Sequence, residues 1–551
     1  MSAQRGRVVL REWLWVLAWA LVLMAFTSLP YLWGWYVSSP EWVFSGFMYN
    51  VEDGNSYIAK MQQGAGGEWL FHLPYTPEEH DGALIYLHFL LLGKAAHLLS
   101  LPSISVYHLA RLVLTVLLLA AVYWFVAWFT AHTALRRVAT LLVAFGGGFG
   151  WLWAASGQPP ALGAMPVDLW VPDGFAFLAV YAFPHICLSQ SLMLWALRRG
   201  LQALAGASWR RGLAAGAAAI LASLVHPFIA PLVIALLGLY ALWQKWRRDR
   251  AFWPQAVVVA LVGLPAMPYL LYLLIVFSTN PVFGAWQAQN LTQSPAPIHY
   301  LLGYGLVGLL AVAGGVYVWR RGDERQTFLL IWALTVPVLA YLPLKLQRRV
   351  LEGYQVPLAT LAAFGLARYG LLPLSRWRPI RWLTRFPRYT LPRLRRFATT
   401  AVVLATLPTN LFLVLGHIGL VSQRAPPAFH PVTFVRAVDW LGHHTDPHET
   451  VLAAFRTGNY IPARAGNRVF AGHGPETVDS EAKQEMLRRF FAAGTDDAFR
   501  RDLLRDSGIV YVFLGPYERK VGGFQAAEAA YLEPVYDEGG VAIYRVVESG
   551  Q

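Results

Sequence analysis

Long apolar segments separated by short polar loops occupy about the first 420 residues of the chain. A helix needs about 20 mainly apolar residues to cross a hydrocarbon core of about 30 Å, and many of these segments reach or approach that length. The pattern predicts about eleven spanning helices, at residues 13–36, 106–130, 138–155, 175–197, 212–226, 228–244, 254–277, 299–319, 327–343, 353–372 and 398–420.

Two segments allow a different interpretation. Residues 212–244 could form one helix kinked at His226-Pro227, but a helix of that length would extend for about 50 Å, more than ordinary tilt absorbs. We therefore expect two helices there. The shorter apolar run at 84–100 carries His88, Lys94 and His97, so we expect an amphipathic helix lying in the membrane interface.

The last 130 residues or so follow another pattern. Apolar strand-like runs (VLAAF, RVFAG, IVYVFLG and VAIYRV) alternate with polar helical patterns such as EAKQEMLRRFF. This alternation predicts a small α/β domain over residues 422–551, after a transmembrane domain over residues 1–421 that includes a long first outer loop at 37–105.

Composition agrees with a polytopic α-helical membrane protein, since 56% of the residues are hydrophobic and only 14% are charged. A net charge of +14 could indicate a nucleic-acid partner, but the basic residues cluster in short loops between apolar segments, as membrane topology requires. We therefore expect no nucleic-acid partner. Cys187 is the single cysteine and lies in an apolar segment, which excludes an intrachain disulfide and a multi-thiolate metal site.

The basic loops also predict the orientation. With the spans above, most basic clusters fall on one side, namely Arg5, Arg7 and Arg11, Arg136-Arg137, Arg198-Arg199, Arg210-Arg211, KWRRDR at 245–250, RRGDER at 320–325 and eight arginines at 376–396. That side is the cytoplasm, because cytoplasmic loops carry the excess of Lys and Arg. A multi-pass cell-membrane protein with a cytoplasmic N-terminus and an extracytoplasmic C-terminal domain follows. The first apolar segment lacks a signal-peptide cleavage site and is expected to stay as an anchor.

Acidic residues lie on the outer side. Glu52 and Asp53 open the polar helical run VEDGNSYIAKMQQ in the first outer loop. Asp53 could serve only as the N-cap of that helix, since Asp is a favoured cap, and we weigh this equally with a functional role. In the next outer loop, MPVDLWVPDGF, Pro-Asp-Gly makes Asp173 a turn residue, whereas turn chemistry does not explain Asp168.

One basic cluster falls on the outer side. The segment LKLQRRVLEGYQVP contains Lys345, Arg348 and Arg349 between two spans. It could be a local exception to the topology rule or the result of a wrong span count, although removing one span would put the basic loops downstream on the wrong side. Arginine at headgroup depth suits a bound phosphate. Neighbours on a helix point about 100° apart, so we expect one arginine to reach a phosphate and the other to pair with Glu352.

Further polar groups sit within or at the ends of spans. Arg111, His185 and His226 are such residues, and ionisable groups there usually face a cavity or a partner. A lone histidine is more often a hydrogen-bonded structural residue. The segment FRTGNYIPARAGNRVFAGHGPET near the C-terminus lacks a glycine fingerprint or triad spacing, so we assign it no chemistry.

This arrangement resembles the GT-C superfamily of membrane glycosyltransferases, which includes protein O-mannosyltransferases, aminoarabinose transferases and oligosaccharyltransferase catalytic subunits. The resemblance covers the whole chain and rests on architecture: Glu52-Asp53 soon after the first span, an interfacial helix in the same loop, and an extracytoplasmic C-terminal domain. Family members carry an acidic motif in that loop. Here the order is Glu52-Asp53, and we assign the family's role to Asp53.

The resemblance implies a glycosyltransferase of the cell envelope with a sugar donor on a polyprenyl phosphate or diphosphate carrier. Asp53, with Glu52 beside it, would act as the general base for an acceptor hydroxyl. Lys345, Arg348 and Arg349, with Arg111, would bind the donor phosphate. Attack opposite the phosphate would invert the anomeric carbon at the outer face, and the acceptor could be a lipid, a protein or a glycan.

Some members of the superfamily need a divalent metal held by acids of the first two outer loops. Asp168 could complete such a site with Asp53 or Glu52, since oxygen ligands suit Mg²⁺ or Mn²⁺. His185, His226 and Asp168 are further candidates for the cavity. The alternative is a transporter or flippase for a glycolipid, but such proteins often show repeated halves and charges at mid-membrane depth.

Overall fold

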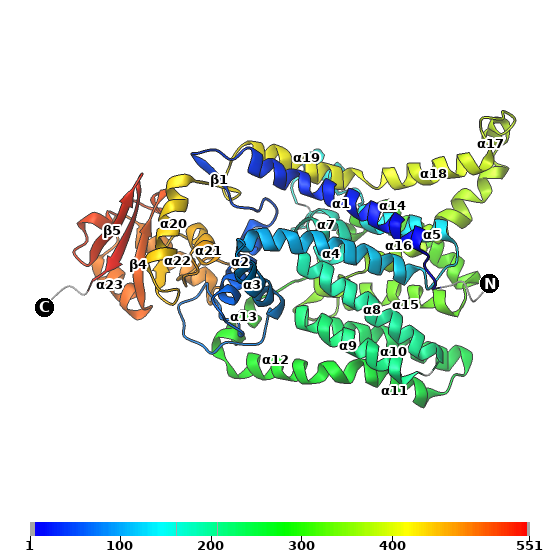
Figure 1. The fold of residues 1–551 in the computed structure, drawn as a ribbon, viewed down its shortest axis with the longest axis horizontal. Helices are drawn as coiled ribbons and strands as arrows, with labels where there is room; N and C mark the ends of the chain where they lie inside the picture. Colours follow the sequence, from blue (N-terminus) through cyan, green and yellow to red (C-terminus); the bar gives the residue numbers. More distant parts are fainter. Residues whose placement is uncertain (1–5, 161, 207, 548–551) are drawn as a thin grey trace. The chain divides into compact units, whose positions relative to one another are not determined.

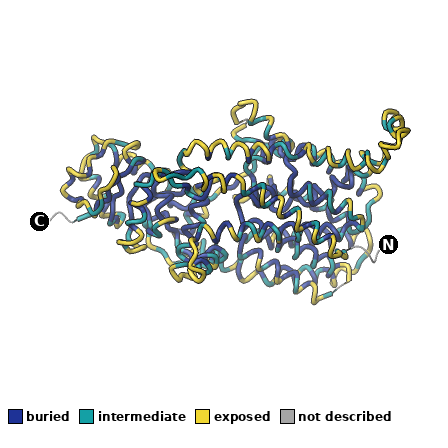
Figure 2. The backbone as a smooth tube through the Cα atoms, turned by 45° about the horizontal axis from the view of Figure 1, so that its top comes forward, coloured by how far each residue is buried: buried dark blue, intermediate teal, exposed yellow. Residues whose placement is uncertain are grey.

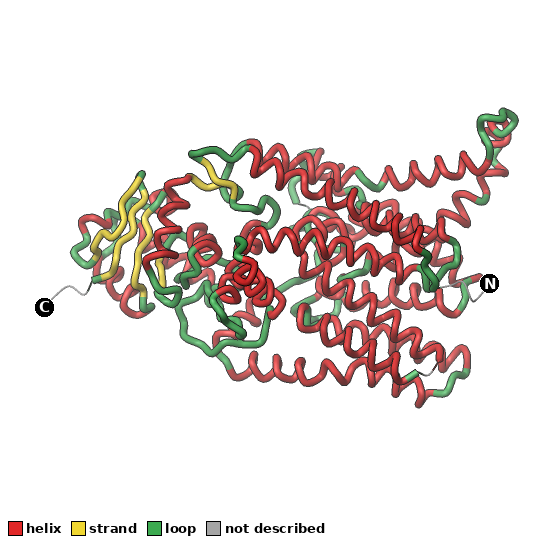
Figure 3. The backbone as a smooth tube through the Cα atoms, in the orientation of Figure 1, coloured by secondary structure: helices red, strands yellow, loops and turns green. Residues whose placement is uncertain are grey.

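The computed structural model describes residues 6–160, 162–206 and 208–547, which are mostly helical (Figure 3). The chain forms two compact units, each built from three segments. The first unit comprises Met1–Ser28, Ala110–Leu271 and Thr292–Gly416, and the second comprises Leu29–Leu109, Tyr272–Leu291 and His417–Gln551. Four helices continue from one unit into the other: α1 (Leu10–Tyr36), α4 (Ser103–Val126), α12 (Met267–Thr279) and α19 (Pro408–Ser422) (Figure 1).

The first unit is built from helices. Besides its parts of the four shared helices, it contains α5 (Thr133–Phe145), α6 (Gly150–Ala155), α7 (Ala176–Ala182), α8 (Pro184–Gly206), α9 (Trp209–Val225), α10 (Ile229–Arg248), α11 (Phe252–Gly263), α14 (Pro297–Arg321), α15 (Glu324–Leu339), α16 (Gln355–Gly365), α17 (Arg378–Leu383) and α18 (Leu391–Ala405). Many of the long helices expose apolar side chains. Figure 2 colours the exposed positions along the helices yellow. Leu309, Val312 and Val316 on α14 are examples, and such surfaces suit contact with lipid.

Six helical segments among the described residues are long and apolar enough to cross a membrane, and α18 with α19, bent by 45°, makes a seventh if the pair is one span. The predicted count of about eleven is therefore not confirmed. The predicted span at 175–197 breaks at Phe183 into α7 and α8, and 327–343 and 353–372 correspond to shorter helices, α15 and α16. The two helices predicted within 212–244 are confirmed, with a break after Val225.

The second unit combines the first outer loop with the C-terminal part. Its helices are α2 (Val51–Ala65), α3 (Leu87–Leu99), α13 (Pro281–Gln289), α20 (Val432–His444), α21 (Phe455–Arg464), α22 (Ser480–Phe491), α23 (Asp497–Asp506) and α24 (Pro516–Val521). The helix α3 has 13 residues, too short to cross a 30 Å core, as expected for the run at 84–100. Helices α2 and α3 pack so closely that a Cβ on Gly93 would lie 1.9 Å from the Met61 carbonyl oxygen.

A four-stranded sheet lies in the C-terminal part, in the order β3-β4-β6-β5. Strands β3 (Thr450–Leu452) and β4 (Ile509–Leu514) pair in parallel, while β6 (Val541–Val546) pairs antiparallel with β4 and β5 (Leu532–Glu538). Strand β1 (Trp42–Phe44) of the first outer loop pairs with β2 (Phe429–Pro431). The predicted strand RVFAG is represented by one bridge between Val451 and Val469, and β5 was not predicted.

One hydrophobic core joins the first outer loop to the sheet. Ala59 of α2 and Tyr75 are buried in the same cluster as Phe434, Val451 and Ile543. The start of α2 is thereby held against the C-terminal part of the second unit, which positions Glu52 and Asp53.

Candidate active site in the first outer loop

Glu52 and Asp53 lie in the first turn of α2. Asn50 is the N-cap, in the left-handed conformation (φ 51°), so the alternative that Asp53 caps this helix is not what the structure shows. Carboxylates are stabilised near a helix N-terminus, where unpaired N–H groups carry partial positive charge. One Asp53 oxygen, Oδ2, accepts a hydrogen bond from the Asn50 side-chain amide. The Asp53 side chain keeps 37% of its surface exposed, so a substrate can approach it.

The other Asp53 oxygen contacts a loop of the C-terminal part, residues 472–477. His473 Nε2 lies 3.0 Å from Asp53 Oδ1, and the Gly474 N–H donates to Glu52 Oε1 at 2.8 Å. Burial alone would lower the pKa of His473, but the carboxylates of Glu476 and Asp53 outweigh it and raise that pKa above its usual value. Both acids of the predicted motif are thus held by this loop.

A buried ion pair fixes the loop about two turns further along α2. Lys60 Nζ lies 2.7 Å from Glu476 Oε1, with side-chain exposures of 0% and 4%. Ser56 also donates to Glu476 Oε1 at 2.8 Å, and the Lys60 ammonium lies 4.5 Å from the Tyr86 ring centroid. Burial by itself would raise the pKa of Glu476, but Lys60 and His473 outweigh it and lower that pKa. At Lys60, burial outweighs the Glu476 carboxylate and lowers the pKa of the ammonium. The contact of 2.7 Å between Lys60 Nζ and Glu476 Oε1 joins the loop to α2.

The other acids of the first outer loop are arranged separately. Glu78 accepts hydrogen bonds from Lys483 of α22 at 2.6 and 2.8 Å. Glu79 and Asp81 line a surface cavity of about 600 Å³ together with Tyr272 and Asn280. None of these contacts involves Asp53.

The predicted basic cluster lies in the first unit. Arg348 and Arg349 lie in a short 3₁₀ helix, Gln347–Leu351, which precedes α16, and Lys345 lies just before it. Lys345 is exposed, the Arg348 guanidinium lies 4.5 Å from the Trp170 ring centroid, and Arg349 Nη1 forms an ion pair with Asp173 Oδ1 at 3.1 Å. Three cations and one carboxylate leave two net positive charges, enough to favour a phosphate.

The predicted pairing of Glu352 with an arginine requires correction. Glu352 is fully buried, its Oε2 lies 2.6 Å from His226 Nδ1, and Ser189 donates to its Oε1. It therefore pairs with His226 rather than with an arginine, because the 3₁₀ turn followed by an extended Glu352 (ψ 121°) removes the helical spacing. Asp173 lies in a turn as predicted, but its buried carboxylate also binds Arg349.

The remaining predicted residues are embedded in the helices of the first unit. Arg111 is buried and donates to Ser28 Oγ at 2.9 Å, to Thr27 Oγ1 and to the Val180 carbonyl. The His185 and His226 rings are 5.3 Å apart. These contacts fit a structural role for both histidines as well as a role at a cavity.

Asp168 is buried near the start of α6. Its Oδ2 accepts hydrogen bonds from Thr409 Oγ1 at 2.7 Å and from the backbone N–H groups of Gly148 and Gly150. Burial raises the pKa of Asp168 to about 6, against the effect of these hydrogen bonds. No group of three or more His, Cys, Asp or Glu residues in the described part of the chain could hold a metal ion. Asp168 belongs to the first unit and Asp53 to the second, so the predicted metal site that pairs them stays a prediction, and we derive no chemical step through a metal.

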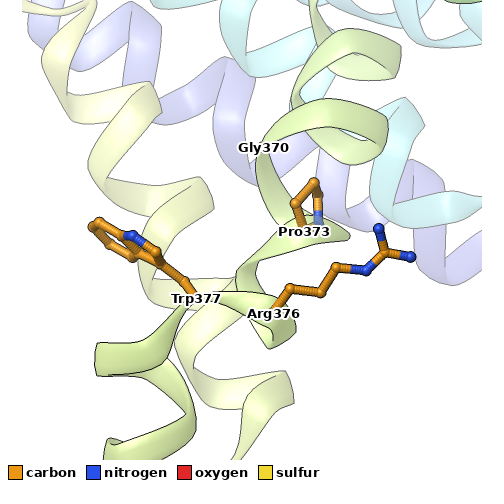
Figure 4. A pocket seen from close by; sticks show the side chains of 4 residues that line it. All are labelled: Gly370, Pro373, Arg376 and Trp377. Atoms are coloured by element: carbon orange, nitrogen blue, oxygen red, sulfur yellow. The ribbon is translucent and has the colours of Figure 1, made fainter.

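A surface cavity of about 430 Å³ lies at residues 370–377, where the arginine-rich segment 376–396 begins. It is lined by Gly370, Pro373, Arg376 and Trp377. Figure 4 shows the Arg376 guanidinium and the Trp377 indole extending to opposite sides. No carboxylate is among these lining residues, so this cavity offers no general base.

Known proteins resemble this chain at the level of structure. No protein-family model matches the chain, and no curated protein matches it either. Solved structures do match over nearly its whole length. The apo oligosaccharyltransferase of Archaeoglobus fulgidus is 13% identical with a TM-score of 0.57, and the match covers 97% of this chain and 75% of that one.

Two further solved structures also match this chain over nearly its whole length. ArnT from Cupriavidus metallidurans, bound to undecaprenyl phosphate, is 13% identical with a TM-score of 0.52, over 97% of this chain and 98% of that one. Arabinofuranosyltransferase AftD from mycobacteria is 17% identical with a TM-score of 0.53, over 97% of this chain but only 42% of that one. The chain has a GT-C fold. The resemblance predicted from the sequence is thereby confirmed at the level of the fold, and it supports a membrane location.

Sequence reasoning missed His473, Glu476, Lys60 and Asn50. Lys60 and Asn50 stand next to the predicted acids, but nothing local distinguishes them from surface residues. The signal for His473 and Glu476 was the Gly-His-Gly-Pro-Glu run in a segment to which we had assigned no chemistry.

Proposed function

We propose that this protein is an inverting membrane glycosyltransferase that moves a sugar from a polyprenyl-phosphate or diphosphate carrier to a hydroxyl acceptor at the outer face of the membrane. The observation that carries the proposal is the partly exposed Asp53 carboxylate at the first turn of α2, held on both oxygens, in a chain with a GT-C fold. ArnT, with the same fold, is bound to undecaprenyl phosphate, and another structure of the oligosaccharyltransferase (TM-score 0.51) contains a dolichol phosphate.

The reaction assigns a role to each group. The acceptor oxygen attacks the anomeric carbon and gives its proton to Asp53, while the bond from that carbon to the carrier phosphate breaks and the phosphate leaves with the electron pair. Lys345 and Arg348, with Arg349 balanced by Asp173, would stabilise the charge on the leaving phosphate. Arg111 would contribute a further positive charge to the binding of the donor phosphate from within the membrane-spanning helices.

The proposal includes the predicted topology. The N-terminus would face the cytoplasm, residues 1–421 would form the transmembrane domain, and residues 422–551 would form the extracytoplasmic domain. His185, His226 and Asp168 would line or support the cavity of the transmembrane domain.

The test is transfer by the purified protein in lipid with a panel of polyprenyl-phosphate sugars, measured as release of the free carrier phosphate. We expect Asp53→Asn to fold normally and to lose activity by at least about a hundredfold, the usual scale for a general base. Asp479→Asn is the matched control, since Asp479 is exposed and Asn suits its left-handed backbone. Full activity in Asp53→Asn, or movement of the glycolipid across the bilayer without release of carrier phosphate, would contradict the proposal.

A further inference from the structure

The loop 472–477 contacts Asp53, the proposed base, through His473, and several contacts fix the position of this histidine. His473 is 4% exposed, and its backbone N–H donates to Thr477 Oγ1 at 3.2 Å. Its ring lies 5.5 Å from the Tyr75 ring centroid. The imidazole is therefore held on several sides by the second unit and has little freedom to turn.

The two ring nitrogens of His473 have different neighbours. The Glu476 backbone N–H donates to Nδ1 at 3.3 Å, so the ring proton is assigned to Nε2. From Nε2 that proton is directed at Asp53 Oδ1, 3.0 Å away. The loop thus presents one fixed N–H donor to the carboxylate.

Two donors together fix the Asp53 side chain. His473 donates to Oδ1 and Asn50 donates to Oδ2. Beside these two donors the Asp53 side chain keeps 37% of its surface exposed, so an acceptor hydroxyl can reach the carboxylate. A carboxylate with a single donor could rotate and would meet an acceptor hydroxyl in the right geometry less often.

The ion pair of Lys60 and Glu476 explains why the loop holds its place. Removing two charges from water is costly and is balanced only when the geometry is good, as it is here at 2.7 Å with a second donor from Ser56. Gln289 of α13 also donates to the Pro475 carbonyl at 2.8 Å. The loop is therefore anchored independently of its contact with Asp53.

We propose that His473 is the positioning residue for Asp53, so that the loop 472–477 of the C-terminal part is required for transfer although it need not touch the donor. This inference rests on the proposed function of Asp53 as the base. It assigns a role to the C-terminal part in the geometry of the catalytic carboxylate, separate from any role in binding the acceptor.

The experiment compares three variants of the full-length protein in lipid. The Gln side-chain amide in His473→Gln can place an N–H near the position of Nε2, whereas the shorter amide in His473→Asn lies near that of Nδ1, and His473→Phe has no donor. We expect the Gln variant to keep kcat within about threefold, and the Asn and Phe variants to lose kcat by about ten- to a hundredfold with the acceptor KM nearly unchanged. His444→Gln, at an exposed histidine, is the control and should match the wild type.

A double variant separates positioning from a general loss of structure. If His473 acts through Asp53, Asp53→Asn with His473→Phe should be no less active than Asp53→Asn alone. Additive losses, equal losses in the Gln and Asn variants, or wild-type kcat in the Asn variant would overturn the inference. Full activity in Asp53→Asn would instead refute the proposed base, so the two failures are distinguishable. Should the Phe variant not fold, the Gln and Asn comparison still decides.

Discussion

Single residues decide how the second unit presents its carboxylates. Glu52 and Asp53 could be predicted because an acidic pair followed by a helical pattern is visible within a few positions of the chain. His473 could not, since it is 420 residues away from Asp53 and the contact exists only once the first outer loop packs against the C-terminal part. The sequence alone therefore located the candidate base and not its partner.

His430 offers a test of a buried titratable group in the same unit. It lies in β2, its Nδ1 is 3.2 Å from the Tyr517 hydroxyl, and burial together with Arg456 lowers its pKa to about 3. An unfolded histidine has a pKa of about 6.5, so between these values the unfolded chain binds the proton first and stability falls as the pH falls. We expect His430→Phe to reduce this loss of stability at low pH, which amounts to about 4–5 kcal/mol of unfolding free energy at most.

The measurement for His430 is hydrogen exchange in β4 and α20 between pH 4 and pH 7 in the detergent-solubilised protein. His444→Phe, at an exposed position, should keep the wild-type pH dependence. An unchanged slope in His430→Phe would show that the buried imidazole is not what limits acid stability there.

The ion pair of Arg349 and Asp173 gives a second prediction at the scale of single residues. The Asp173 side chain is 3% exposed, so Arg349→Ala would leave a buried carboxylate without its cation and cost about 2 kcal/mol of unfolding free energy. Asp173→Ala added to it should recover most of that loss in a thermal-unfolding assay, but should not restore transfer. Equal melting temperatures in the wild type and Arg349→Ala would contradict the ion pair's structural role.

Helices and strands could be predicted from the sequence where the periodicity of polar and apolar residues is strong. Helix α22 and strands β4 and β6 appear close to the expected positions, because their polar or apolar periodicity is unambiguous. Strand β5 could not be recognised: it pairs only with β6, and its sequence LEPVYDE exposes charged residues, as edge strands often do. The predicted pairing of Glu352 with an arginine was wrong because the prediction assumed a helix where the chain forms a 3₁₀ turn.

The contact between α2 and α3 yields a prediction at the scale of elements. A Cβ on Gly93 would lie 1.9 Å from the Met61 carbonyl oxygen, a backbone atom that cannot move alone. We expect Gly93→Ala to push α3 away from α2, to lower the melting temperature and to reduce transfer, because α2 carries Asp53. Gly419→Ala, in a helix with open space around the glycine, is the matched control. Wild-type activity in Gly93→Ala would show that the spacing of these helices does not matter for Asp53.

At the scale of the whole molecule, the sequence predicted the GT-C architecture, whereas its count of about eleven spans is not confirmed. Hydropathy counts an apolar stretch as one span, whereas Phe183 and the segment after α16 interrupt the helices in ways that depend on packing. The comparisons support the architecture at 13–17% identity, so the fold is retained where little of the sequence is.

Topology gives the last prediction, because the proposed reaction requires Asp53 and the C-terminal domain on the outer side. Cys187 is fully buried, so the wild type should react poorly with an aqueous maleimide and single new cysteines can report on their surroundings. We expect Glu481→Cys in α22 to be labelled by a membrane-impermeant maleimide on intact cells, and Arg385→Cys, among the arginines at 376–396, to be labelled only after permeabilisation. Both positions are exposed, so reactivity reports sidedness rather than burial. Labelling of Arg385→Cys on intact cells would place that basic loop outside, reverse the orientation and remove the proposed base from the outer face.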